Sequence, residues 1–331
     1  MERGDGTAGT APVGNADGYS ATQRDRPGNP RTSIAESKND ISFGKLLKHH
    51  LRDWLMVVVV AIVEIIVYVV IPPFHRFVSR FNIDDYRYPR ETTTVPTWSV
   101  LLIAVLAPLV GFFIFFIRRR SVRDFHNAFL GLATAIALTA LLTDSIKNTV
   151  GMPRPDFFLR CFPDRQDNYD PITQGVICHG SSNDIRDGYK SFPSGHASWS
   201  FAGLGYLSMY LTGKLGVFDK RGWTSRVVIV FIPLLCATLV AVSRVDNYQH
   251  RWWDCIFGAF LGLIVAYFNY RSHFPSVFSD NAGFPYKYIP GTEAHSSVPS
   301  GPTRQAIGED DPAMKNGPAR DMESGGRDLR Q

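Results

Sequence analysis

Three short polar clusters contain the side chains of this 331-residue chain whose types and spacing could do chemistry. The clusters occupy residues 147–155, 193–196 and 243–254, and each adjoins the end of a long apolar stretch. Their charged and ionisable members include Lys147, Arg154, His196, Arg244, His250 and Asp254. Such a set is suited to holding a phosphate group, attacking its phosphorus atom and protonating the group that leaves.

The three cations are predicted to hold the phosphate. Arg154 and Arg244 each present a planar fork of N–H groups that matches two phosphate oxygens, and Lys147 adds a compact positive charge. Taken singly, a Lys or Arg at the end of an apolar helix more often only extends its charge to water. Three of them on one face beside two histidines favour phosphate binding. Asp144 precedes Lys147 by three residues, so we also expect an ion pair between these two side chains.

The second cluster, Pro193-Ser194-Gly195-His196, precedes an apolar stretch and predicts the start of a helix. Ser194 can cap that helix, and Gly195 lets the backbone approach a ligand closely. Because the free N–H groups at a helix start bind anions, Ser194 and Gly195 are predicted phosphate-binding residues. On its own, this cluster is better explained as a helix cap with no further role.

His250 and Asp254 lie four residues apart at the predicted start of another helix and therefore share one of its faces. A carboxylate that accepts a hydrogen bond from one imidazole nitrogen fixes the tautomer and leaves the other nitrogen free as a nucleophile or base. The same spacing could hold a metal ion instead. The surrounding Lys and Arg side chains would repel a cation, so we predict neither a metal nor another cofactor.

Long apolar stretches must position these clusters, although the mean hydropathy of the whole chain is only −0.06. A transmembrane helix needs about 20 mostly apolar residues. Six stretches meet or nearly meet this requirement: 54–72, 98–117, 127–146, 197–212, 226–243 and 252–268. The fourth is short and contains Gly203 and Gly205, so we expect it to pack among other helices rather than to face lipid.

The sequence therefore predicts an all-α integral membrane protein, with a six-helix transmembrane bundle over residues 45–275. Residues 1–44 and 276–331 are polar and show no helical or strand period, which predicts disordered tails. Lys and Arg gather in the loops after the second and fourth stretches, which places those loops and both tails in the cytoplasm. The three polar clusters then fall on the lumenal or extracellular face, of either the plasma membrane or the endoplasmic reticulum.

The formal charge of +5 excludes little by itself. We expect no nucleic-acid partner, because the arginine clusters flank apolar stretches and form no basic stripe with interleaved aromatic residues. Cys161 and Cys178 share one polar loop. They could form a disulfide if that loop faces an oxidising compartment, and their spacing alone leaves the question open.

In order and spacing, the three clusters resemble the three-part signature of the type 2 phosphatidic acid phosphatase superfamily. Segments such as Arg154-Pro155-Asp156-Phe157-Phe158 and Ser191-Phe192-Pro193-Ser194-Gly195-His196 are most similar to its plant lipid phosphate phosphatases. The resemblance covers the apolar bundle, about 45–275, and implies a phosphatase with six spans. It also implies that the partners are the bilayer and a lipid phosphate within it.

The same resemblance implies a two-step mechanism that needs no metal. His250 would attack phosphorus and form a phosphohistidine, and Asp254 would orient it. His196 would protonate the departing lipid alkoxide and then activate water. The phosphate oxygens would be held by the remaining site residues: Lys147, Arg154, Ser194, Gly195 and Arg244.

The implied reaction converts phosphatidic acid to diacylglycerol, with diacylglycerol pyrophosphate and lysophosphatidic acid as further substrates. Met152 departs from the family pattern, because many relatives have Arg there, and it removes one cation from the mouth of the site. Two competing hypotheses are a phosphatase for soluble phosphates on the same fold and a catalytically silent membrane scaffold. A need for substrate presented in lipid or detergent would separate the first from a lipid phosphatase. Silent relatives typically lose signature residues, and here both histidines and the aspartate are present.

Overall fold

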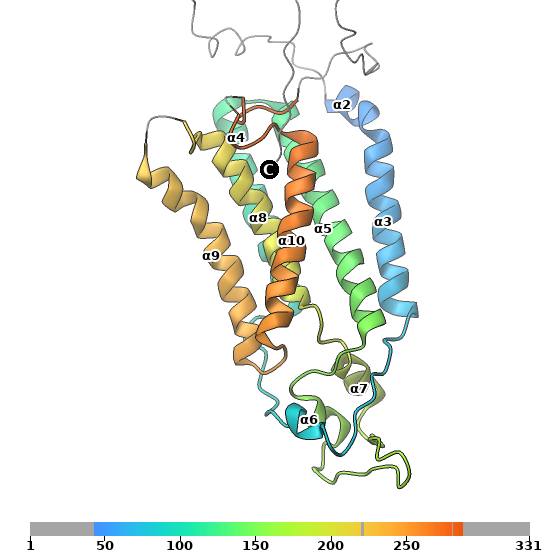
Figure 1. Ribbon diagram of the computed structural model, residues 1–331. Coiled ribbons are helices and arrows are strands. Elements are labelled where there is room, and N and C mark those ends of the chain that lie inside the picture. Colours follow the sequence, from blue (N-terminus) through green and yellow to red (C-terminus); the bar gives the residue numbers. More distant parts are fainter. Residues whose placement is uncertain (1–42, 220–221, 280, 287–331) are drawn as a thin grey trace, which may run out of the picture. The chain divides into compact units, whose positions relative to one another are not determined.

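The computed structural model describes residues 43–219, 222–279 and 281–286. Long helices dominate this part of the chain (Figure 1). They are α3 (Leu51–Val70), α4 (Thr97–Arg119), α5 (Val122–Val150), α8 (Gly195–Leu215), α9 (Thr224–Asp246) and α10 (Trp252–His273). The predicted all-helical bundle is therefore present.

Five of these helices, all but α8, are long and apolar enough to cross a membrane. Helix α8 has the length for a span, with 21 residues, but it contacts α4, α5, α9 and α10 and buries most of its residues among them. A helix surrounded by protein does not need an apolar surface for lipid, so Ser, Thr and Tyr are tolerated in it. The crossing of the membrane by α8, and hence the sixth span, stays a prediction.

Small residues allow α8 to pack this closely. A Cβ atom added at Gly203 would lie 2.1 Å from the backbone oxygen of Ala104 in α4. A Cβ atom added at Gly262 in α10 would lie 2.2 Å from the backbone oxygen of Ser198 in α8. Glycine at these two positions therefore lets the backbones of α4 and α10 approach α8 from two directions.

The outer helices present apolar side chains on the surface of the bundle. Helix α3 has no buried residue, and Ile62, Ile65 and Val69 on it are more than half exposed. Phe231 on α9 and Phe260 on α10 are likewise exposed. A surface of this composition suits lipid and not water.

One end of the bundle is covered by the connection between α5 and α8, which contains the short helices α6 (Phe157–Cys161) and α7 (Ser182–Gly188) (Figure 1). This connection has a small core of its own around Phe157 and Phe162. A disulfide joins Cys161 to Cys178, which answers the question that their spacing left open. The segment between α3 and α4 contributes Val78 and the 3-10 helix η1 (Ile83–Tyr86) to the same core.

The other end of the bundle holds the two ends of the described chain. Helix α2 (Phe43–His49) leads into α3 there, and the ring of His50 lies 6.5 Å from that of His273 at the end of α10. Described structure continues beyond residue 275, the predicted end of the domain, and the amide of Tyr286 donates to the backbone oxygen of His273 (3.1 Å). The remainder of the two predicted tails, 1–42 and 287–331, lies outside the described residues.

Candidate active site

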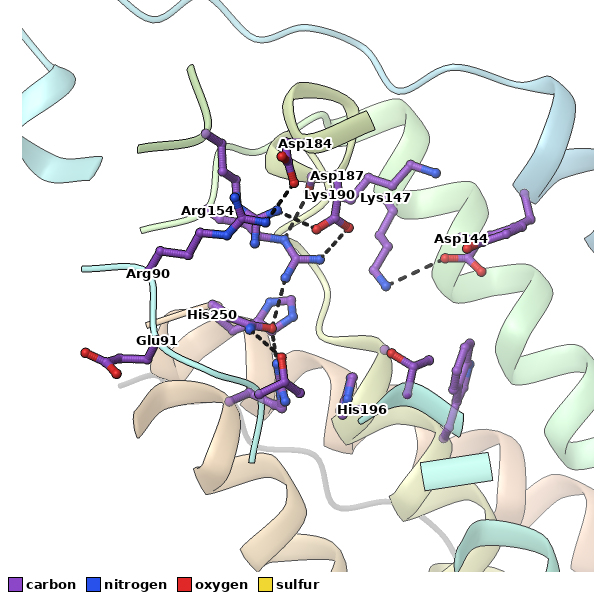
Figure 2. Close-up of a pocket in the computed structure, with 18 of the residues that line it drawn as sticks. Arg90, Glu91, Asp144, Lys147, Arg154, Asp184, Asp187, Lys190, His196 and His250 are labelled. Atoms are coloured by element: carbon purple, nitrogen blue, oxygen red, sulfur yellow. Dashed lines mark hydrogen bonds and ion pairs between the residues drawn. The ribbon is translucent and has the colours of Figure 1, made fainter. Parts of the chain in front are cut away.

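Six of the eight predicted site residues line one cavity of about 860 Å³ at the α6–α7 end of the bundle. They are Lys147, Arg154, Gly195, His196, Arg244 and His250. Figure 2 shows four of them around this cavity, on segments far apart in the sequence. The remaining two, Ser194 and Asp254, are fully buried and do not line the cavity.

A carboxylate positions Arg154. The Nε and Nη2 atoms of Arg154 donate to the backbone oxygen of Asp187 (3.0 Å) and to its Oδ1 atom (2.9 Å). The other carboxylate oxygen of Asp187 accepts from Nη1 of Arg160 (2.7 Å), whose Nε donates to Asp156 (2.9 Å). Burial raises the pKa of Asp187, but Arg154 and Arg160 outweigh burial and lower the pKa to about 2. Asp187 therefore stays ionised and holds both guanidinium groups.

Lys147 lies at the last turn of α5 and points at the start of α8 (Figure 2). Its Nζ atom is 3.6 Å from Asp144, so the ion pair expected from their spacing is present. A Cβ atom added at Gly195 would lie 2.8 Å from the same Nζ atom. Gly195 therefore lets the ammonium group sit directly against the first turn of α8, where unpaired N–H groups add to the positive potential.

Ser194 is the N-cap residue of α8, as its sequence context predicts, but its hydroxyl makes no capping hydrogen bond. The hydroxyl is one of the buried polar groups that have no hydrogen-bond partner within the described residues. The amide of Ser194 instead donates to the backbone oxygen of Asp254 (3.0 Å), which ties the start of α8 to the start of α10. The expected side-chain cap is thus absent.

His250 precedes α10, which begins at Trp252, so this histidine is on the loop and not on the helix that its spacing predicted. Its Nδ1 atom is 3.7 Å from Oδ2 of Asp254, which is longer than a hydrogen bond. The same Oδ2 atom accepts from the hydroxyl of Ser191 (2.6 Å) and from the amide of Arg251 (3.0 Å). Burial lowers the pKa of His250 to about 4, so the imidazole is neutral at physiological pH.

A backbone carbonyl orients the second histidine. His196 Nε2 lies 3.0 Å from the backbone oxygen of Val95, and this nitrogen carries the proton because a carbonyl oxygen can only accept. The Nδ1 atom of His196 is thereby left with its lone pair. Arg244 Nη1 donates to the same oxygen (3.1 Å), so one carbonyl fixes a histidine from the second cluster and an arginine from the third.

The segment that provides this carbonyl was missed at the sequence level. Residues 88–96, here called the strap, run from η1 to α4 and contact the loop after α9 repeatedly. Thr93 accepts from Gln249 (3.0 Å), the amide of Thr94 donates to Asn247 (3.2 Å), and Tyr88 stacks on Tyr248. Its composition, with several Thr residues and Pro96, indicates only a loop. The strap therefore had no sequence signal that pointed to a site.

Acidic side chains also line the cavity, including Glu64 of α3 and Glu91 of the strap. The aspartates among them are paired with cations: Asp144 with Lys147, and Asp184 with Arg90 (2.8 Å). Within the described residues, no three His, Cys, Asp or Glu side chains converge in a group that could hold a metal ion. The absence of a metal from the reaction stays a prediction.

Comparison with known proteins decides the family. Residues 128–278 match the PAP2 superfamily, and Lipid phosphate phosphatase 2 of Arabidopsis thaliana is 47% identical over 242 residues, which cover 73% of this chain and 83% of that protein. The chain belongs to the PAP2 superfamily. Within this superfamily it is of the plant lipid phosphate phosphatase type, as the signature residues predict. Lipid phosphate phosphatase 1 of Arabidopsis thaliana is 44% identical over 74% of this chain and 75% of its own length.

More distant PAP2 superfamily members include Diacylglycerol pyrophosphate phosphatase 1 of Saccharomyces cerevisiae. It is 34% identical over 70% of this chain and 81% of its own length. No solved structure matches the chain significantly. The matched family region, 128–278, contains all three polar clusters but stops short of the strap, α3 and α4.

Proposed function

We propose that this protein is a metal-independent lipid phosphate phosphatase that converts phosphatidic acid to diacylglycerol and inorganic phosphate. The observation that supports this most strongly is the meeting of two histidines and three cations at one cavity. Diacylglycerol pyrophosphate and lysophosphatidic acid offer the same terminal phosphate and are further substrates. The printed names of the relatives, lipid phosphate phosphatase and diacylglycerol pyrophosphate phosphatase, agree with this substrate class.

In the first step, His250 is the nucleophile. Asp254 is 3.7 Å from its Nδ1 atom, so Nδ1 carries the proton and the lone pair of Nε2 attacks phosphorus. The phosphate monoester binds as its monoanion and passes its own proton to the lone pair of His196 Nδ1. The bond between phosphorus and the lipid oxygen then breaks, and Nδ1 delivers this proton to that oxygen. As positive charge develops on the imidazole, the 3.7 Å distance between His250 Nδ1 and Asp254 Oδ2 shortens to that of a hydrogen bond. Such shortening is common when a substrate enters an active site.

In the second step, water attacks the phosphohistidine. His196 Nδ1 takes a proton from this water, the bond between phosphorus and nitrogen breaks, and His250 is restored. The proton on His196 Nδ1 then leaves with the inorganic phosphate. Throughout both steps, the Nε2–H group of His196 keeps its hydrogen bond to Val95 and holds the ring in place. Lys147, Arg154 and Arg244 compensate the charge that the five-coordinate phosphorus accumulates.

The bundle presents this site on the lumenal or extracellular face. We place α8 as the sixth span, which puts both described ends of the chain at the end of the bundle opposite the site. With the Lys and Arg of the loops at that opposite end, both tails are cytoplasmic. The disulfide between Cys161 and Cys178 lies on the site side, which supports an oxidising compartment there.

The cavity also has the surface that a lipid needs. Its lining includes Tyr68 of α3, Leu101 of α4 and Trp199 of α8. Tyr68 lies in the last turn of α3, and Leu101 and Trp199 lie near the starts of α4 and α8, so we place all three near the depth of the glycerol and the upper acyl chains. A soluble phosphate would leave this part of the cavity without a partner.

The test is phosphate release from phosphatidic acid in detergent micelles with excess EDTA, for the wild type and for His250→Ala. Release that survives EDTA and disappears in the variant, while the variant stays folded and membrane-inserted, supports the proposal. Release by the His250→Ala protein at the wild-type rate would remove this histidine from the nucleophile role. Release from soluble phosphate esters alone would point to the competing phosphatase for soluble phosphates.

A further inference from the structure

Gln249, the residue directly before the proposed nucleophile, occupies the space between two phosphate-binding arginines. Its Oε1 atom accepts from Nη1 of Arg154 (3.4 Å) and, at close range, from Nη2 of Arg244. Its Nε2 atom donates to the hydroxyl of Thr93 on the strap (3.0 Å). Gln249 also lines the cavity, next to His250.

The chemistry of the partners fixes which end of the amide faces the arginines. A guanidinium group only donates hydrogen bonds, so two of them can converge only on an acceptor. The amide oxygen of Gln249 is that acceptor, and the amide nitrogen is left for Thr93. An oxygen held between two guanidinium forks occupies the place that an oxygen of a bound phosphate would take.

The backbone before Gln249 holds the side chain in this position. Tyr248 has φ +54°, in the left-handed region that a bulky residue seldom adopts. Its amide donates to the backbone oxygen of Val245 (2.9 Å), and its ring stacks on Tyr88 of the strap. The turn that aims Gln249 at the arginines is therefore stabilised from both sides.

We propose that Gln249 is a displaceable stand-in for phosphate, which holds Arg154 and Arg244 in their binding orientation and moves aside when the anion enters. This inference rests on the proposed function, because it assigns these two arginines to phosphate. Gln249 stabilises the empty site and competes with the anion for the same two donors. Thr93 tethers the amide and so adds to that competition.

The experiment is a titration of detergent-solubilised full-length protein with orthovanadate and with inorganic phosphate, read out as the rise in Tm. Anions that bind only the folded protein stabilise it by RT ln(1 + L/Kd), where L is the anion concentration, so the rise in Tm with anion concentration reports Kd. Gln249→Leu keeps the bulk of the side chain but removes the acceptor. We expect it to lower Tm without anion and to tighten vanadate binding about tenfold, the scale of one net hydrogen bond to a charged group.

The tether gives a matched pair of variants. Thr93→Val removes the hydroxyl that holds Gln249, and a smaller tightening of roughly threefold is expected, because the tether is exposed to solvent. Thr94→Val makes the same change one residue later, where the hydroxyl makes no hydrogen bond with the described residues, and it should leave the vanadate affinity at the wild-type value. Equal affinities for the Thr93 and Thr94 variants would contradict the tether.

Two outcomes would overturn the assignment of Gln249. Weaker vanadate binding by Gln249→Leu would make the amide a phosphate ligand, and a lower Tm with unchanged affinity would make it a purely structural residue. Failure of the proposed function looks different: the wild type itself would bind neither anion, or Arg154→Ala would bind both as tightly as the wild type.

Discussion

Asp187 is the residue outside the three clusters whose replacement gives the sharpest test of how the site is held together. Its carboxylate lies between Arg154 and Arg160 and its backbone oxygen accepts a further bond from Arg154. Asp187→Asn keeps one acceptor oxygen but turns an N–H2 group toward the other guanidinium, which only donates. One charge-assisted hydrogen bond is lost, and so is the negative charge between two arginines.

The size of the effect follows from burial. A hydrogen bond to a charged group contributes about 1.5–3 kcal/mol. The Asp187 side chain is 49% exposed although that of Arg154 is only 11% exposed, so solvent screens part of the interaction and the lower end of this range applies. A loss of about 1.5 kcal/mol in the placement of Arg154 corresponds to a roughly tenfold lower kcat. KM should change little, because loss of the carboxylate also removes repulsion of the phosphate.

Asp184→Asn is the matched control. It makes the same substitution on the same short helix, and Asp184 also pairs with an arginine, Arg90 (2.8 Å). Arg90 also lines the cavity, but it is 47% exposed and is not one of the proposed phosphate-binding residues, and an exposed ion pair contributes at most about 1 kcal/mol. Steady-state phosphate release from mixed micelles should therefore separate the two variants. Equal kcat values for them would refute the role assigned to Asp187.

Three further predictions concern the chemistry and the fold. The proposed nucleophile, His250, must be neutral to attack, and its pKa is lowered to about 4. The value of kcat/KM should therefore fall only as the pH drops through about 4. A fall in kcat/KM near pH 6.5, the ordinary pKa of histidine, would contradict this. Vanadate, which mimics five-coordinate phosphorus, should inhibit turnover while excess EDTA leaves it intact; activity lost in EDTA and restored by magnesium would favour a metal mechanism. Cys161→Ser should lower the free energy of unfolding by about 3 kcal/mol, since the disulfide closes a loop of 17 residues. Thermal melts with and without reductant check this. Reductant should lower the Tm of the wild type to that of the variant.

The sequence predicted the bundle well because apolar stretches of span length have few alternatives. It also placed the three clusters at helix ends on one side, since alternate helices of a bundle run in opposite directions. Helix α8 was the weakest part of that prediction. Its Gly and Ser residues give α8 a low hydropathy. They are tolerated because four other helices enclose α8, and a hydropathy window along the chain cannot detect this enclosure.

The clusters predicted residues that meet at one cavity, but they did not predict what holds those residues in place. Arg154 and Asp187 are 33 residues apart, and Val95 and Arg244 are 149 residues apart. Contacts at such separations leave no periodic trace in the sequence. The four-residue spacing of His250 and Asp254 did not predict their geometry fully, because the helix begins after His250. The loop therefore sets the distance between them, and the Asp254 carboxylate already accepts a hydrogen bond from Ser191.

The long connection before α4 has a role in the site, because its strap contacts site residues that lie at the ends of two different helices. Arg244 of α9, which is proposed to bind phosphate, and His196 of α8 lie on different helices, and both donate to the backbone oxygen of Val95. A carboxylate acceptor there would add a negative charge beside the phosphate, whereas a carbonyl orients both groups with only a dipole. Because one oxygen serves both, a displacement of the strap would disturb proton transfer and phosphate binding together. The loop that the sequence left without a role is therefore the element that makes the proposed acid and the proposed anion site a single unit.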